Sequence, residues 1–383
     1  MRKLLFILLF SAANGFCFCQ TAANVDKEKL FDFYQNQQYS EAASYLTNIY
    51  GTDLKDFKVI TQIAYCYLMG GNTIEAEKLY LKANLLQPQN LQVLFNLANI
   101  STRRGYIEKS KTYLKEVVKL DSTNFNAYIQ LAGLYQEVFS FQKLQYLKSA
   151  NKINPLDADV VFDMSEIYMK MGMYGLVSNI LKPALETDSN NIQLLKIKLP
   201  LLLVTSKLDD AILTGEKLFT LGDSSTYVLN NLGKVYYTKK EFQKAIYYFK
   251  KVSLSATDDN EALFYNMALC YRGLKDYLTA AEYFKKAINA GISKNTIVYY
   301  TKMGESYEQA EKFESAAATY KKGVFFDNDG SLLYILAQIY DKKLNQKSNA
   351  LTTYAQVLKS LPDTEGNKPA KEYITKRIEE LRK

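Results

Sequence analysis

Apolar residues recur at helical spacing along most of the chain, and residues 230–252 show the pattern in its most regular form. Leu232, Gly233 and Tyr236 share one face of a helix, and a short polar turn follows them. The next helix has its own apolar face, made of Phe242, Ala245, Phe249 and Val252. Small residues let two helix backbones approach closely, and aromatic rings fill the space around the contact. The pattern predicts a helical hairpin that needs neighbours to bury its remaining apolar faces.

This hairpin pattern repeats with a nearly constant period. The position of Gly233 recurs ten times at intervals of 33 to 36 residues, at Leu30, Ala64, Ala98, Ala132, Ser165, Leu199, Gly233, Ala268, Gly304 and Ala337. An aromatic residue follows three positions later in most units, at Phe33, Tyr67, Tyr135, Tyr168, Tyr236, Tyr271, Tyr307 and Tyr340. We therefore expect much of the high tyrosine content to serve packing between helices.

The period and the small residues at the helix crossings resemble the tetratricopeptide repeat, a 34-residue helix–turn–helix unit that stacks on copies of itself. The resemblance covers about 340 of the 383 residues. It implies an all-α solenoid, wound as a right-handed superhelix. We expect a continuous array of about ten units over residues 20–363, irregular at 158–225, and a capping helix over residues 364–383.

The resemblance also implies where a partner would bind. In this family the first helix of each unit lines a concave wall, where aromatic rings supply contact area and polar groups pair with a bound peptide. Carried onto this sequence, the strongest candidates are Asn230, Lys234, Tyr237, Tyr265 and Arg272, followed by Tyr227, Tyr334, Phe95 and Tyr65. The alternative is that these are ordinary surface residues of a tyrosine-rich chain. The clamp residues of the chaperone-binding members are not reproduced, so a C-terminal carboxylate ligand is not implied.

Turn-forming residues separate the units, at 87–90, 121–124, 154–155 and 188–191. The middle of the chain is irregular, because Pro183 and Pro200 fall inside expected helices. An interior proline costs roughly 3 kcal/mol and kinks or ends a helix. Two interpretations are open: a degenerate pair of units with shortened helices, or a bend that separates an N-terminal arm from a C-terminal arm.

The two ends differ from the repeats. Ile374, Ile378 and Leu381 form a narrow apolar stripe near the C-terminus, which suits a helix that caps the solenoid. A helix lying on a membrane surface is the alternative. Residues 1–19 combine a charged start with a short apolar run and small residues, which predicts a secretory signal peptide. A lipid anchor on Cys17 or Cys19 is less expected, because a bulky phenylalanine precedes each cysteine.

The amino-acid composition excludes several kinds of catalytic and metal-binding site. The chain has no histidine, so Ser-His or Cys-His catalysis and histidine metal ligands are excluded. Its sequence contains no phosphate-binding loop and no nucleophile elbow, and we expect no enzyme activity, cofactor or metal. The segment from Asp327 to Gly330 lacks calcium-loop spacing and predicts a turn. Cys66 and Cys270 lie six units apart, so we expect buried, unbonded thiols.

The net charge is +8, and the lysines are distributed along the whole chain, which favours solvated helix surface over a nucleic-acid footprint. The first functional hypothesis is a non-enzymatic adaptor, exported to the periplasm or outer envelope of a double-membraned bacterium, that binds a protein or peptide in its concave groove. The second is a structural subunit of an envelope export or assembly machine, which could handle polysaccharide. Sequence does not decide the oligomeric state.

Overall fold

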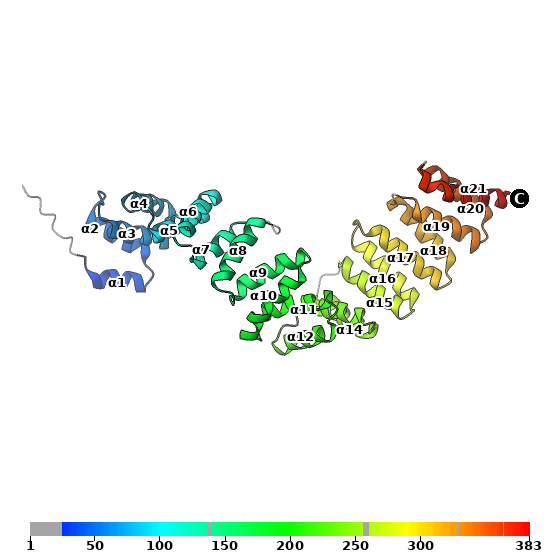
Figure 1. The fold of residues 1–383 in the computed structure, drawn as a ribbon, viewed down its shortest axis with the longest axis horizontal. Coiled ribbons are helices and arrows are strands. Elements are labelled where there is room, and N and C mark those ends of the chain that lie inside the picture. Colours follow the sequence, from blue (N-terminus) through cyan, green and yellow to red (C-terminus); the bar gives the residue numbers. More distant parts are fainter. Residues whose placement is uncertain (1–24, 137–139, 256–259, 328, 363) are drawn as a thin grey trace, which may run out of the picture. The chain divides into compact units, whose positions relative to one another are not determined.

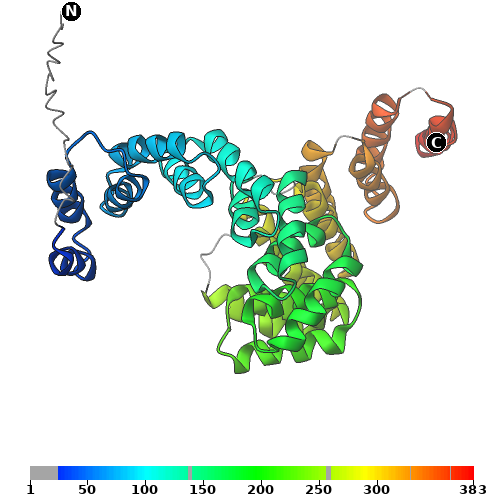
Figure 2. The same ribbon diagram turned by 60° about the vertical axis from the view of Figure 1, so that its left-hand side comes forward.

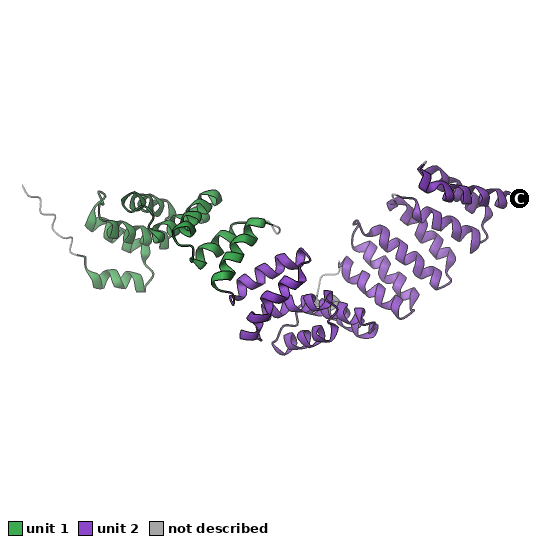
Figure 3. Cartoon of the chain, viewed as in Figure 1, with its two compact units in different colours: residues 1–154 green, residues 155–383 purple. Residues whose placement is uncertain are grey.

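The computed structural model describes residues 25–136, 140–255, 260–327, 329–362 and 364–383. These residues fall into two compact units, residues 1–154 and 155–383, which Figure 3 shows in green and purple. The predicted signal peptide at residues 1–19 lies outside the described residues.

Unit 1 is built from antiparallel helix pairs, each helix packing on the next along the chain (Figure 1). Its helices are α1 (Lys27–Gln35), α2 (Tyr39–Tyr50), α3 (Phe57–Met69), α4 (Thr73–Leu86), α5 (Leu91–Arg103), α6 (Ile107–Leu120), α7 (Phe125–Gly133) and α8 (Phe141–Ile153). Each odd-numbered helix is the first helix of a predicted repeat, and the following even-numbered helix is the second.

Unit 2 continues the same arrangement, as Figures 1 and 2 show from two directions. Its α-helices are α9 (Ala158–Lys170), α10 (Tyr174–Thr187), α11 (Ile192–Val204), α12 (Leu208–Thr220), α13 (Thr226–Thr238), α14 (Phe242–Ser255), α15 (Glu261–Gly273), α16 (Tyr277–Ala290), α17 (Thr296–Gln309), α18 (Phe313–Gly323), α19 (Ser331–Lys342), α20 (Lys347–Ser360) and α21 (Lys368–Arg382). Two short 3-10 helices, Val324–Phe326 and Glu365–Asn367, lie in the connections. The predicted all-α solenoid with a final capping helix is confirmed.

The helix boundaries follow from local chemistry. The predicted turns lie between helices, and in three of them an asparagine side chain (Asn90, Asn124 or Asn191) accepts a hydrogen bond from the backbone N–H three residues later. A second signal lies within the repeats, where the turn from first to second helix contains a residue with positive φ. These residues are Gln37, Gly71, Gly105, Gly172, Ser206, Lys240, Lys275, Glu311 and Asn345. Glycine is thus not required there, because the surrounding hydrogen bonds hold the turn.

The helix crossings are packed as the sequence predicts. Gly233 faces the ring of Phe249, and a Cβ atom on the glycine would lie 2.5 Å from a ring carbon. Gly304 faces Tyr320 in the same way two repeats later. The recurring aromatic of the first helix stacks on a tyrosine of the second: the centroids of Tyr236 and Tyr248 are 5.3 Å apart. Tyr271 and Tyr283 repeat this stacking at 5.2 Å, and the rings of Tyr135 and Tyr146 lie 5.8 Å apart in a tilted arrangement.

The two prolines do not shorten their helices, so that interpretation is wrong. Pro183 lies inside α10, which has 14 residues, and Pro200 inside α11, which has 13, as in the regular repeats. A proline removes one backbone hydrogen bond, but the apolar face of α11 still packs: Leu195, Leu199 and Leu202 are buried. Tertiary burial therefore outweighs the local cost. The predicted bend concerns the relative placement of the arms and stays a prediction.

The C-terminal helix α21 packs on the last repeat. Ile374 and Ile378 are buried in a cluster with Tyr354 and Val357 of α20, and Leu381 packs against it. Its apolar stripe is thus used within the chain, as expected for a capping helix. Among the described residues, no helix combines the length and apolar character needed to cross a membrane.

Candidate functional site

The first helices of unit 2 lie against one another and form a wall. Helix α9 contacts α11, α11 contacts α13, and α13 contacts α15. Two side-chain contacts extend the wall to α17: the rings of Tyr265 and Tyr299 have centroids 5.1 Å apart, and Arg272 bonds to Glu305. The repeat register explains this, because the same face of each first helix is presented at every period. We call this surface the inner wall.

Three of the predicted binding residues lie on two contacting helices of the inner wall, and we call them the central cluster. Tyr237 comes from α13, and Tyr265 and Arg272 come from α15. Burial raises the pKa of Tyr237, the nearby Cys270 and Tyr265 raise it further, and the positive charge of Arg272 opposes them. All three side chains are half-buried. The structure thus brings together residues that lie up to 35 positions apart in sequence.

An ion network covers one side of this cluster. Arg272 Nη2 lies 3.0 Å from Glu305 Oε2, and Lys302 Nζ lies 3.0 and 3.1 Å from the two oxygens of the same carboxylate. Two cations share one anion, so the trio carries one net positive charge. The side chains are about one third exposed or less, with 25% for Arg272 and 33% for Glu305. Such a site suits a partner's carboxylate or backbone carbonyl.

Asn230 and Lys234 lie on α13 with their polar groups unused. Both side chains are half-buried, and neither has a hydrogen-bond or ion-pair partner in the part of the chain that the structure describes. The neighbouring Asn231 is different, because its amide donates to the carbonyl of Tyr227 at 2.9 Å and the residue is buried. Asn230 and Lys234 therefore keep their donors available to a partner.

Tyr227 and Tyr334 have structural contacts of their own. The Tyr227 hydroxyl donates to the backbone carbonyl of Lys196 at 3.3 Å, while 43% of the residue stays exposed. The ring of Tyr334, on α19, packs against Tyr354 with centroids 6.4 Å apart. Neither residue contacts the central cluster through any described interaction.

The last two predicted residues lie in unit 1. Tyr65 lines a groove of about 460 Å³ between α3 and α5, together with Tyr80, Gln62 and Asn96. Phe95 does not line this groove and instead packs against the core cluster around Leu94 and Leu114. The groove has aromatic walls and several amides, but it belongs to a unit separate from the central cluster.

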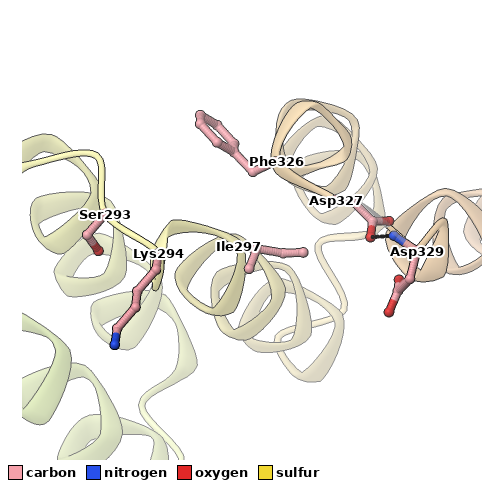
Figure 4. Close-up of a pocket in the computed structure, with 6 residues that line it drawn as sticks. All are labelled: Ser293, Lys294, Ile297, Phe326, Asp327 and Asp329. Atoms are coloured by element: carbon pink, nitrogen blue, oxygen red, sulfur yellow. Dashed lines mark hydrogen bonds between the residues drawn. The ribbon is translucent and has the colours of Figure 1, made fainter.

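A second groove, of about 380 Å³, lies between two connections of unit 2 (Figure 4). The figure shows Ser293, Lys294 and Ile297 on one side and Phe326, Asp327 and Asp329 on the other. Both carboxylates hold backbone N–H groups: Asp327 accepts from Leu332 at 2.7 Å, and Asp329 from Ser331 at 2.9 Å. Both hydrogen bonds satisfy N–H groups in the first turn of α19, while residue 328 of the predicted turn lies outside the described residues.

The described residues offer few buried groups that could bind a metal ion or react. Among the described residues, no three His, Cys, Asp or Glu side chains gather closely enough to hold a metal ion. Cys66 and Cys270 are fully buried and form no disulfide, as predicted. Burial raises the pKa of the Cys270 thiol to about 12, so the thiol stays protonated at neutral pH.

Sequence reasoning missed part of the site. Lys302 was not among the candidates, although its spacing of three residues from Glu305 on one helix could have indicated the pair. Tyr299 was also missed; its hydroxyl donates to Glu261 at 2.5 Å and its ring packs on Tyr265. The hydrogen bond from Tyr299 to Glu261 joins residues 38 positions apart, so no local sequence pattern could have predicted it.

Sequence profiles of the tetratricopeptide repeat match residues 91–124, 226–256, 262–290 and 331–364. Each match coincides with a helix pair: α5–α6, α13–α14, α15–α16 and α19–α20. The matched stretches make up about a third of the chain, and in them the chain is similar to this repeat in both sequence and helix-pair packing.

Known proteins with similar sequence or fold are distant. BBSome complex member BBS4 of Bos taurus is 21% identical over 310 residues, which cover 79% of this chain and 58% of that protein, so the chain spans less than two thirds of this relative. Among solved structures, a monomeric mutant of IFIT1 with Gppp-AAAA is 15% identical, with a TM-score of 0.50 and coverage of 92% of this chain and 89% of that one. A tetratricopeptide repeat protein from Parabacteroides merdae is 18% identical, with a TM-score of 0.40 and coverage of 63% and 96%.

Proposed function

We propose that this chain, a tetratricopeptide repeat protein, is a non-enzymatic scaffold that holds a protein or peptide segment against the inner wall of unit 2. The observation that carries the proposal is the pair of unused donors, Asn230 and Lys234, on the same wall as the half-buried aromatics Tyr237 and Tyr265. Neither group is among the buried polar atoms that lack a partner, so both stay accessible to solvent and to a binding partner. Their exposure next to aromatic rings favours a surface that a partner completes.

The chemistry of the wall suits an extended polypeptide. Aromatic rings give contact area at low entropic cost, and the Asn230 amide can pair with a backbone carbonyl and a backbone N–H at once. Lys234 and the positively charged trio of Arg272, Lys302 and Glu305 favour a partner that carries a carboxylate near its bound segment. Binding at such a wall needs no group transfer, and we assign the chain no enzyme activity.

The test is affinity capture from native cells with a matched pair of variants. Asn230→Ala with Lys234→Ala removes the two unused donors without breaking a described contact. Asn179→Ala with Lys182→Ala removes an amide and an ammonium from exposed positions of a second helix, α10, and serves as the control. We expect one or a few proteins to be captured by wild type and control and lost from the inner-wall variant. Equal capture by all three would refute binding at this wall.

We further propose that the chain works outside the cytoplasm, in the periplasm or outer envelope. The support is the charged start and short apolar run of residues 1–19. Mass spectrometry of the chain purified from fractionated native cells tests this. A mature chain that begins at Gln20 and fractionates with the periplasm or outer envelope supports the proposal, whereas a full-length chain in the cytoplasm contradicts it.

A further inference from the structure

Adjacent lysines occupy the same place in three consecutive second helices. They are Lys250–Lys251 on α14, Lys285–Lys286 on α16 and Lys321–Lys322 on α18. Their spacings of 35 and 36 residues equal the repeat period, so each pair follows the buried Phe249, Phe284 or Tyr320 of its own helix. All six side chains are exposed. The lysines that seemed distributed in the sequence are therefore aligned here, and we call these six residues the lysine row.

Helix packing links the three second helices of the row. Helix α15 packs on both α14 and α16, and helix α17 packs on both α16 and α18. Lys286 Nζ lies 4.6 Å from the centre of the Tyr283 ring. Burial raises the pKa of Tyr283, and the charges of Lys286 and Lys250 oppose this effect. Figure 1 shows α15 to α18 as successive neighbouring helices, so the lysine row extends from α16 to α18.

Four of the six lysines lack an ion-pair partner in the described part of the chain. They are Lys250, Lys285, Lys321 and Lys322. Like charges on neighbouring helices repel one another, and this cost persists until an anion binds or salt screens it. The row contains no arginine, so it lacks the fork geometry that selects phosphate groups.

We propose that the lysine row binds an extended acidic polypeptide segment. An extended chain advances about 3.3 Å per residue, so a short segment can reach from one lysine pair to the next. Carboxylates at intervals along such a segment can meet each pair in turn. Exposed Tyr247, one helical turn from Lys250–Lys251, gives the same segment an aromatic contact.

The surroundings of the row favour a narrow partner over a broad one. Glu282 is exposed one helical turn before Lys285–Lys286. A lipid surface or a nucleic-acid duplex that covered the row would bring its own negative charges close to this carboxylate, and the like charges would repel. A single extended chain that follows the row need not touch Glu282. The row lies on second helices and the inner wall on first helices, so this binding is independent of the function proposed above.

The experiment compares two triple variants of the full chain. Lys250→Gln, Lys285→Gln and Lys321→Gln remove one lysine from each pair. Lys275→Gln, Lys312→Gln and Lys347→Gln remove three exposed lysines at the opposite ends of second helices in the same unit, with the same change in net charge. Fluorescence anisotropy measures binding of a labelled peptide of repeated Glu-Glu-Ser triplets, and of the same peptide with Gln in place of Glu. Vesicles rich in phosphatidylglycerol and a duplex DNA are the competing probes.

We expect wild type and the control variant to bind the acidic peptide alike, and the row variant to bind roughly tenfold more weakly, since each exposed ion pair adds a modest amount. The Gln peptide should not bind. The inner-wall variant Asn230→Ala with Lys234→Ala should bind the acidic peptide as wild type does. Equal weakening in both triple variants would reduce the effect to net charge and overturn the proposal. Tighter binding of wild type to vesicles or DNA than to the peptide would overturn it as well.

Discussion

The hydroxyl of Tyr227 on α13 donates a hydrogen bond of 3.3 Å to the backbone carbonyl of Lys196 on α11. In an unbroken helix this carbonyl would accept the N–H of residue 200, but residue 200 is Pro200, which has none. A side chain from the next repeat therefore satisfies the carbonyl that the proline leaves free. Tyr227 was predicted as a binding residue, and the structure gives it this structural contact as well.

This relationship predicts a coupling between two substitutions. Tyr227→Phe should lower the free energy of unfolding by about 1 kcal/mol in the wild-type background, since a carbonyl loses its partner. In a Pro200→Ala background the cost should be close to zero, because the new N–H at residue 200 bonds the carbonyl itself. Urea unfolding of the four proteins measures the coupling. An equal cost of Tyr227→Phe in both backgrounds would show that the hydroxyl does not compensate for the proline.

An ion pair of Arg377 joins the capping helix α21 to the last repeat. Arg377 Nε and Nη2 donate to the two oxygens of Asp341 on α19, both at 2.8 Å, and the Asp341 side chain is only 2% exposed. Arg377→Ala leaves this carboxylate buried with one remaining donor, the hydroxyl of Tyr354. We expect a loss of roughly 3 kcal/mol in stability at this end of unit 2 and faster hydrogen exchange in residues 368–382.

The control for this prediction lies on the same helix. Lys376→Ala removes an exposed cation one residue away and should change stability by less than about 0.5 kcal/mol. If both variants exchange hydrogen at the same rate as wild type, the Asp341 contact does not hold α21 in place.

The same ion pair predicts an acid-sensitive terminus. The Arg377 guanidinium, with help from the Tyr354 hydroxyl, holds the pKa of Asp341 below its ordinary value of 3.8, while burial acts in the opposite direction. A carboxyl whose pKa is lowered on folding adds stability above its unfolded pKa, and this stability is lost as the pH falls through the folded value. We expect the stability difference between wild type and Asp341→Asn to be largest above about pH 5 and to shrink below about pH 3.5. A difference that stays constant over this range would contradict the assignment.

Two glycines test the helix crossings. Gly233→Ala places a methyl group 2.5 Å from the Phe249 ring and should cost about 1–3 kcal/mol, because the ring has to move. Gly175→Ala is the matched control, since Gly175 also lies within a helix but its Cβ would meet nothing within 4 Å. The control should gain up to about 1 kcal/mol from helix propensity. Melting temperatures that move in the same direction for both would show that the crossing at Gly233 is not tightly packed.

The candidate site was predicted only in part. The repeat register located Tyr237, Tyr265 and Arg272 on first helices, and the structure brings these three together. The register could not show that Glu305 would form ion pairs with both Arg272 and Lys302. An ion pair between two repeats depends on which side-chain rotamers meet. It also placed Phe95 on the binding wall, where the structure packs the ring against the core of unit 1.

The sequence by itself determined the helix pairs, their boundaries and their crossings. These features are local: a period near 34 residues, a small residue at each crossing and a capping side chain at many helix starts fix which face of each helix is buried. Only the tertiary structure decided which distant groups meet, such as Tyr227 with the Lys196 carbonyl and Arg377 with Asp341. The physical reason is that hydrogen bonds and charges act over a few ångströms, so they depend on the stacking of whole repeats and leave no pattern within any single one.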